Sequence, residues 1–279
     1  YLGSSTAAPA GTYGSVPYTG DGTSSLDIAF ASLTTTGATD YNATTTQLHR
    51  EYSPTLKSVS TAGQPRFEYS PTDSASMGLL IEGQSQNLLP NGATGYNSSD
   101  VFSWTTMYSN FAQNAAIAPT GSLEATHFYE DTEPTTQHRI TVSVTATAAA
   151  HTLSGYFKSA GRDDVQFRVT NGGVNYWAKF NFSTETASDA GNPFSSLRVS
   201  SVGNGWYRFE ATTPTLTAGS TTIYVNLYNG SMTYTGDGYS GVLFYGLQFE
   251  AGAASSLIAT VDSAVTRAAD SASVDLTQA

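Results

Sequence analysis

Three stretches of the chain carry aromatic side chains at alternate positions of expected β-strands. In TIYVNLY, three aliphatic side chains alternate with Tyr224, Asn226 and Tyr228, and in NYWAKFNF the apolar positions alternate with Trp177. Successive side chains of a strand point to opposite faces, so burial of the apolar set turns the other set outward. In LSGYFKS the same reasoning turns Tyr156 outward.

These outward residues suit the binding of sugars. Flat aromatic rings stack on the C–H faces of pyranoses, while amides and charged groups hydrogen-bond the hydroxyls. A second set lies in the loop MTYTGDGY, where two tyrosines flank an acid, and loops often carry recognition residues. The sequence therefore predicts a carbohydrate-binding surface that contains Tyr156, Trp177, Tyr224, Asn226, Tyr228, Tyr234 and Tyr239.

The same residues fit a protein interface equally well. Tyr and Trp are enriched where subunits meet, because they bury large amphipathic surfaces. Outward aromatics of a sandwich would then cover a neighbouring subunit or the N-terminal region of the same chain. The two interpretations differ in one property, which is whether the rings stay open to solvent in the folded protein.

The sequence shows no catalytic constellation. Its four histidines are dispersed and are expected at the surface or in turns. The acids Glu130, Asp131 and Glu133 share a stretch with Pro134, which is typical of a solvated loop rather than of two carboxylates facing one cleft. A nucleophile elbow, a phosphate-binding glycine loop and a metal-binding histidine pair are also missing from the sequence. We therefore expect neither enzyme activity nor a catalytic metal.

Composition excludes several classes of partner. The 279 residues include 22 acidic and 11 basic side chains, for a net charge of -11, which argues against a basic face for nucleic acid or anionic lipid. No apolar run is long enough to span a membrane as a helix. Cysteine is absent, so disulfides and thiolate sites are excluded. The chain begins with Tyr1, and we expect a processed or trimmed sequence.

Strand and turn signals dominate the second half of the chain. The segments RITVSVT, VQFRV and TIYVNLY alternate apolar and polar residues, and turn pairs such as Asn171-Gly172 and Asn204-Gly205 separate the strands. Many short strands with such turns indicate an all-β fold of the jelly-roll β-sandwich type. We expect the sandwich over residues 84–252, after a loop-rich N-terminal β region over 1–83 and before an extended C-terminal segment over 253–279.

Six short motifs run in a fixed order between residues 65 and 270. They are PRFEYSP at 65–71, GLLIE at 78–82, QNLL at 86–89, NGWYR at 204–208, GLQFEAG at 246–252 and AVTRAAD at 264–270. Together they resemble a family of bacteriophage virion proteins found in tail fibres, head fibres and spikes. The resemblance implies a virion structural protein, located on the particle surface, that forms a homo-oligomer with other virion proteins as partners.

The inner part also resembles the jelly-roll carbohydrate-binding modules attached to polysaccharide hydrolases. The similarity rests on NLLPNG at 87–92, on Trp104, and on the apolar strand 242–249. Trp104 would either plug the sandwich or line a sugar groove. Such modules often hold a structural Ca²⁺, for which Glu124, Glu250 and the Asn91 carbonyl would be the candidates. The chain has no contiguous acidic loop to support this site, so no cofactor is expected.

Taken together, these resemblances imply a phage fibre or spike protein whose sandwich attaches to host-surface polysaccharide. One alternative is a purely architectural protein, a capsid decoration or fibre that binds only other virion proteins. A second alternative, a polysaccharide depolymerase, would require another acid across a groove from Glu130 or Asp131.

Overall fold

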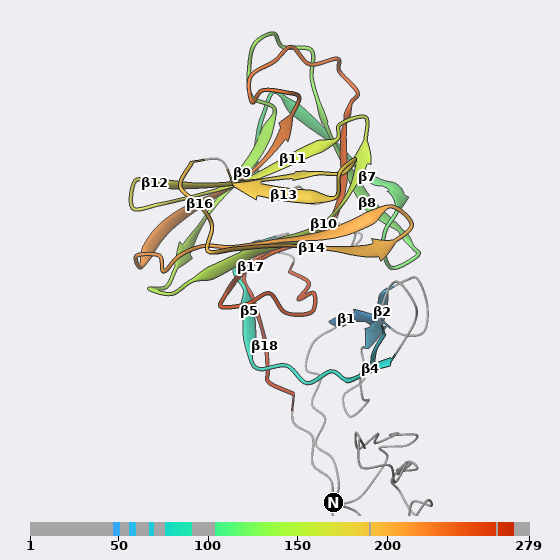
Figure 1. Cartoon of the computed structure of the whole chain (residues 1–279), viewed down its shortest axis with the longest axis vertical. Helices are drawn as coiled ribbons and strands as arrows, with labels where there is room; N and C mark the ends of the chain where they lie inside the picture. Colours follow the sequence, from blue (N-terminus) through green and yellow to red (C-terminus); the bar gives the residue numbers. More distant parts are fainter. Residues whose placement is uncertain are drawn as a thin grey trace, which may run out of the picture.

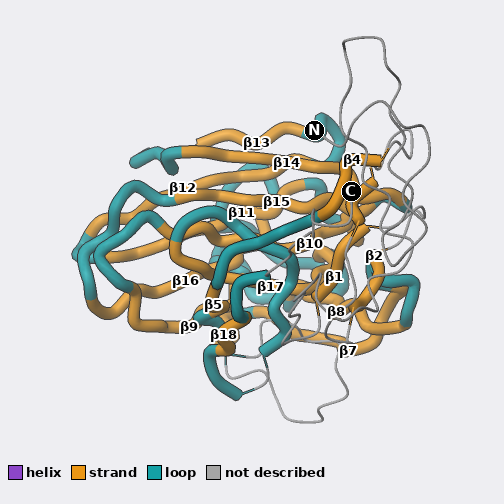
Figure 2. The backbone as a smooth tube through the Cα atoms, turned by 90° about the horizontal axis from the view of Figure 1, so that it is seen from below, coloured by secondary structure: helices purple, strands orange, loops and turns teal. Residues whose placement is uncertain are grey.

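The described part of the molecule consists of strands and loops (Figures 1 and 2), so the expected all-β class is confirmed. None of its residues forms a helix long and apolar enough to cross a membrane. The structure is a computed structural model, and it describes residues 47–50, 56–59, 67–69, 76–90, 104–189, 191–260 and 262–270.

Two six-stranded antiparallel sheets stack to form the predicted jelly-roll sandwich (Figure 1). One sheet, called the front sheet below, contains, in spatial order, β13 (Thr186–Asp189), β12 (Val174–Asn181), β11 (Asp164–Asn171), β16 (Gly219–Tyr228), β9 (Arg139–Ala146) and β6 (Thr105–Met107). The back sheet contains β14 (Ser196–Gly203), β15 (Trp206–Thr212), β10 (His151–Ala160), β17 (Gly241–Ala251), β8 (Leu123–Glu130) and β7 (Ser109–Ile117).

Three short antiparallel pairs lie outside these sheets. Two of them form within the expected N-terminal region, and the third joins a strand before the sandwich to one after it. In Figure 1 this third pair lies below the back sheet. The pairs are β1 (Gln47–Arg50) with β2 (Leu56–Val59), β3 (Phe67–Tyr69) with β4 (Ser76–Leu79), and β5 (Ser85–Asn87) with β18 (Val265–Arg267).

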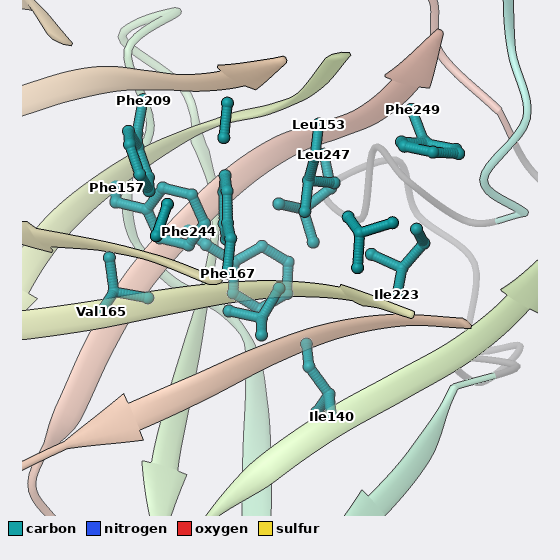
Figure 3. Packing of buried hydrophobic residues seen from close by; sticks show 14 of the residues in the cluster. Ile140, Leu153, Phe157, Val165, Phe167, Phe209, Ile223, Phe244, Leu247 and Phe249 are labelled. Atoms are coloured by element: carbon teal, nitrogen blue, oxygen red, sulfur yellow. The ribbon is translucent and has the colours of Figure 1, made fainter. Parts of the chain in front are cut away.

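Phenylalanine rings from the two sheets fill the space between them (Figure 3). Phe167 of β11 stacks on Phe209 of β15, with ring centroids 4.6 Å apart, and meets Phe157 of β10 edge-on at 5.4 Å. All three side chains are fully buried, and burial of each contributes about 1.5–3 kcal/mol. Trp104 is also buried in this core, so it plugs the sandwich and does not line a groove.

Two hairpins follow directly from the turn residues of the sequence. Gly172 and Gly173 connect β11 to β12, and Asn204 and Gly205 connect β14 to β15. Both residues of each pair have positive φ, between 54° and 82°. This is the tight turn whose twist matches antiparallel strands, and glycine and asparagine adopt it at low cost.

Asn87, at the end of β5, joins three parts of the chain. Its Nδ2 donates to the carbonyl oxygens of Leu247 (3.2 Å) and Ile258 (3.0 Å), and its Oδ1 accepts from the backbone N–H groups of Leu89 and Phe249 (3.1 Å each). The side chain is completely buried. One amide therefore fixes the start of the sandwich to β17 and to residues 252–260, called the covering segment below.

Glu250, near the end of β17, is a second buried link to the covering segment. Its carboxylate accepts hydrogen bonds from the hydroxyl of Ser85 (2.7 Å), Nε2 of Gln248 (3.0 Å), and both the amide (3.0 Å) and the hydroxyl (2.5 Å) of Ser255. A buried carboxylate is tolerated only when donors replace its water. The four donors meet that requirement.

A buried arginine holds the two ends of the described sandwich together. Arg267 is fully buried and donates to Oε2 of Glu82 (2.8 Å) and to the Gly83 carbonyl (2.9 Å). The other carboxylate oxygen of Glu82 accepts from the Ser256 amide (2.7 Å), and the Asp270 amide donates to the Glu82 carbonyl (2.8 Å). The chain before β5 and the chain after β18 are consequently fixed at one place, on the side of the back sheet (Figures 1 and 2).

Replacing Asn87 with alanine should destabilise the protein strongly, because four backbone groups lose their partner at once. We expect Asn87→Ala to lower the free energy of unfolding by about 3 kcal/mol, measured by denaturant titration. Gln86→Ala is the matched control, since Gln86 is the exposed neighbour on the same strand. Equal stability of the two variants would contradict this role of Asn87.

Candidate functional site

The outer face of the front sheet presents three rows of polar and aromatic side chains. Strand register places Trp177 of β12, Arg168 of β11, Tyr224 of β16 and Thr141 of β9 in one row. The next row contains Lys179, Gln166, Asn226 and Arg139, and the third contains Asn181, Asp164 and Tyr228. The inward neighbours of these residues form the core, so strand alternation alone fixes which set faces outward.

Arg168 lies between two aromatic rings at the centre of this face. Its guanidinium carbon is 3.4 Å from the ring centroid of Tyr224 and 4.7 Å from that of Trp177. The guanidinium of Arg139 approaches the Tyr224 ring from β9, at 5.1 Å. Cations over aromatic faces are attracted by the ring quadrupole, which orders both arginines and both rings. All four side chains remain partly exposed.

Tyr228 and Lys179 form a second aromatic and cationic pair on the same face. The ammonium nitrogen of Lys179 is 4.7 Å from the Tyr228 ring centroid and 3.4 Å from the Asp164 carboxylate. Asn181 also donates to Asp164, at 3.0 Å. The face therefore combines aromatic rings, amides, cations and one acid, which is a set of groups that can stack on a sugar ring and hydrogen-bond its hydroxyls.

Unsatisfied polar atoms gather on this face. Within the described residues, ten buried side-chain nitrogen or oxygen atoms lack a hydrogen-bond partner, and five belong to these rows. An unpaired buried polar atom costs about 1–3 kcal/mol, so these atoms reduce stability unless water or another molecule pairs with them. The five are Nε of Arg139 and Arg168, Oγ1 of Thr141, Oε1 of Gln166 and Oδ1 of Asn226.

The structure brings together four of the seven residues expected to bind carbohydrate. Trp177, Tyr224 and Tyr228 are partly exposed on the outer face of the front sheet, and Asn226 is on the same face but only 1% exposed. The sequence reasoning missed Arg168 and Arg139. The signal for Arg168 was present, since the alternation in VQFRV that buries Phe167 turns its neighbour outward.

The expected exposure of Tyr156 is wrong. Tyr156 lies on β10 in the back sheet, where it points away from the main core but is only 4% exposed. It packs in a second apolar cluster with Trp206, Tyr245 and Leu257, and Leu257 belongs to the covering segment. Alternation predicted the direction of the side chain, but the chain that folds over it comes from about a hundred residues later.

Tyr234 and Tyr239 lie in the loop between β16 and β17 and have opposite environments. Tyr239 is 69% exposed. Tyr234 packs against the main core, and its hydroxyl donates to Oε2 of Glu130 at 2.7 Å. Burial and this hydrogen bond raise the pKa of Tyr234, so it remains a neutral donor. Tyr234 therefore anchors the loop.

Glu130 is fully buried, which corrects its expected place in a solvated loop. Arg162 donates to it from Nε (2.8 Å) and from a second guanidinium nitrogen, and the Asp237 amide adds a third contact at 2.8 Å. Arg162 also pairs with the Asp237 carboxylate at 3.3 Å. Partial burial opposes ionisation of Asp237, but hydrogen bonds from Ser240 and Tyr239 and the charge of Arg162 lower its pKa to about 2. The Glu130 carboxylate thus accepts hydrogen bonds from Arg162, Asp237 and Tyr234.

Histidines and the calcium candidates also differ from their expected settings. His138 and His151 are fully buried, although they were expected at the surface or in turns.

The four donors around Glu250 occupy its oxygens, so this carboxylate is not available as a cation ligand. Glu124 accepts a hydrogen bond from Thr120 at 3.1 Å, and Asn91 lies outside the described residues. In the described part, no group of three or more metal-ligating side chains converges.

Comparison with known proteins finds similarity only at the level of solved structures. No protein-family model matches the chain, and no curated protein matches its sequence. The module TmCBM61 in complex with β-1,4-galactotriose is 13% identical with a TM-score of 0.35, over 60% of this chain and 99% of that one. The CBM22-1 xylan-binding domain of Paenibacillus barcinonensis Xyn10C is 16% identical with a TM-score of 0.36, over 61% and 94%.

A third similar structure comes from a phage. The enzymatically active domain of bacteriophage CBA120 tailspike protein 4 is 11% identical with a TM-score of 0.33, over 58% of this chain and 21% of that one. At these identities and TM-scores, none of the three likenesses carries an argument about function. The function proposed for the chain therefore depends on the outer face of the front sheet.

The hydrogen bond from Tyr234 should make a measurable contribution to stability. We expect Tyr234→Phe to lower the free energy of unfolding by about 2 kcal/mol, because a buried carboxylate loses one of its donors. Thermal or chemical denaturation would measure the change. Tyr239→Phe removes the same hydroxyl from the exposed tyrosine of the same loop and should have no effect, so equal losses in both variants would contradict the anchoring role.

Proposed function

We propose that the sandwich binds host-surface glycans through the outer face of the front sheet. The observation that carries this proposal is the row formed by Trp177, Arg168 and Tyr224, in which two partly exposed rings flank an ordered guanidinium. The adjacent rows add partly exposed polar groups, which are the ammonium group of Lys179 and the amide of Asn181. Rings for stacking and amides for hydroxyl groups are what a pyranose requires of a protein surface.

We further propose that the chain is a structural protein of a phage particle, in a fibre or spike, and that it acts without catalysis. The ordered motifs between residues 65 and 270 support the virion assignment. The position of the site suits display, since Arg267 and Glu82 fix both chain segments on the side of the back sheet, opposite the front sheet. In a homo-oligomer, several copies would raise the avidity of a weak single site.

The test is a binding screen of the purified chain against bacterial capsule and lipopolysaccharide fragments, using a glycan array followed by titration calorimetry. We expect Trp177→Ala to weaken binding at least tenfold, equivalent to ~1.4 kcal/mol, while leaving the melting temperature near that of the wild type. The reason is that Trp177 is partly exposed and contributes a stacking surface rather than core packing.

Leu123→Ala is the control, because it removes an exposed apolar side chain from β8 of the back sheet, outside the three rows. It should bind glycan as the wild type does. Light scattering on the same samples separates the architectural alternative. A folded oligomer without glycan binding, which dissociates in the Trp177→Ala variant, would reassign the face to subunit contact.

A further inference from the structure

Two cations of the front-sheet face, Arg139 and Arg168, lack acidic partners in the described part of the chain. Arg162, Arg208 and Arg267 each contact a carboxylate, at distances of 3.3 Å or less. Within the described residues, no carboxylate lies within 4 Å of Arg139 or Arg168. The chain has twice as many acidic as basic side chains, so partners were available in its composition. Two adjacent arginines without one are therefore a specific feature of this face.

The two guanidinium groups converge on one aromatic ring. Arg168 on β11 and Arg139 on β9 approach the Tyr224 ring from the two strands that flank β16, with guanidinium carbons 3.4 and 5.1 Å from its centroid. Arg139 makes one side-chain hydrogen bond, to Gln137 at 2.6 Å, and the Nε atoms of both arginines are unpaired. Both arginine side chains are partly exposed, so their other guanidinium N–H groups can meet a ligand at the same place.

Placing two like charges together without a counter-ion is unfavourable. Burial lowers the pKa of Arg168; the adjacent Tyr224 opposes this effect, and the charge of Arg139 adds to it. An anion bound next to both groups would relieve this repulsion. Guanidinium groups bind carboxylates through paired, charge-assisted hydrogen bonds, which are stronger than neutral ones.

We propose that the glycan recognised by this face is acidic, with a sugar carboxylate such as that of a hexuronate bound by Arg168 and Arg139. This inference rests on the proposed function, since it specifies the ligand of the same face. Trp177 then stacks on a neighbouring sugar of the glycan. Lys179 lies at the other end of the row that contains Arg139, and it is the third cation along the path of the glycan. Because the whole chain carries a charge of -11, the attraction is local to this face.

The experiment compares hexuronate-containing capsular polysaccharides with the same polymers after their carboxyl groups are reduced to primary alcohols. Each pair has the same linkages and differs only where a carboxylate is replaced by a neutral primary alcohol. Titration calorimetry of the wild-type chain should give affinities at least tenfold higher for the acidic member of a pair. This comparison needs no variant, so it stands even where a substitution disturbs folding.

Arg168→Gln and Arg139→Gln provide the second arm, because glutamine retains polarity but not charge. Both variants should lose the preference for the acidic polymer, so that the ratio of the affinities for the acidic and reduced forms falls towards one. Arg198→Gln is the matched control, an exposed arginine on β14 of the back sheet. Circular dichroism and melting temperature verify that each variant is folded.

The outcomes distinguish the two proposals. Equal binding of the acidic and reduced forms, abolished by Trp177→Ala, would overturn the acidic ligand while supporting glycan binding by this face. A preference for acidic polymer that survives both arginine substitutions would overturn the role of Arg168 and Arg139. Binding of neither form by the folded chain would overturn the proposed function itself.

Discussion

The two-residue alternation of β11 is the constraint on which the front-sheet face depends. Val165, Phe167 and Val169 are fully buried between the sheets, so Gln166 and Arg168 have to face outward. A slip of one residue would bury the arginine and expose the phenylalanine that stacks on the opposite sheet. The free energy of core packing therefore fixes which side chains the outer face presents. The same requirement, burial of the apolar side chains, fixes the register of the neighbouring strands.

The motifs that resemble phage virion proteins have a structural explanation that is separate from binding. Several motif residues make buried polar contacts that join the chain before and after the sandwich to the back sheet. Among them are Glu82, Asn87, Gln248, Glu250 and Arg267. Buried polar and charged groups are stable only when nearly every hydrogen bond is made. These motifs specify how the sandwich is joined to the chain segments before and after it, whereas the residues of the front-sheet face lie outside them.

The buried charge network around Glu130 and the proposed binding face lie in different parts of the molecule. Around Glu130, the guanidinium of Arg162, the hydroxyl of Tyr234 and the amide of Asp237 satisfy the carboxylate. On the front-sheet face, by contrast, some buried polar atoms have no hydrogen-bond partner, and two arginines have no acidic partner among the described residues. A fold that can satisfy one buried carboxylate so fully could have paired these groups as well. Their unpaired state supports the proposal that a ligand binds this face.

The sequence by itself determined the local features, which are the strands, the tight turns at Gly172-Gly173 and Asn204-Gly205, and the outward direction of Trp177 and Tyr224. These depend on neighbours within a few residues. Only the tertiary structure decided that Leu257 covers Tyr156, and that Arg139 and Arg168 meet over one ring. Those outcomes depend on which strands pair and on what packs over them, and such contacts join residues far apart in the chain.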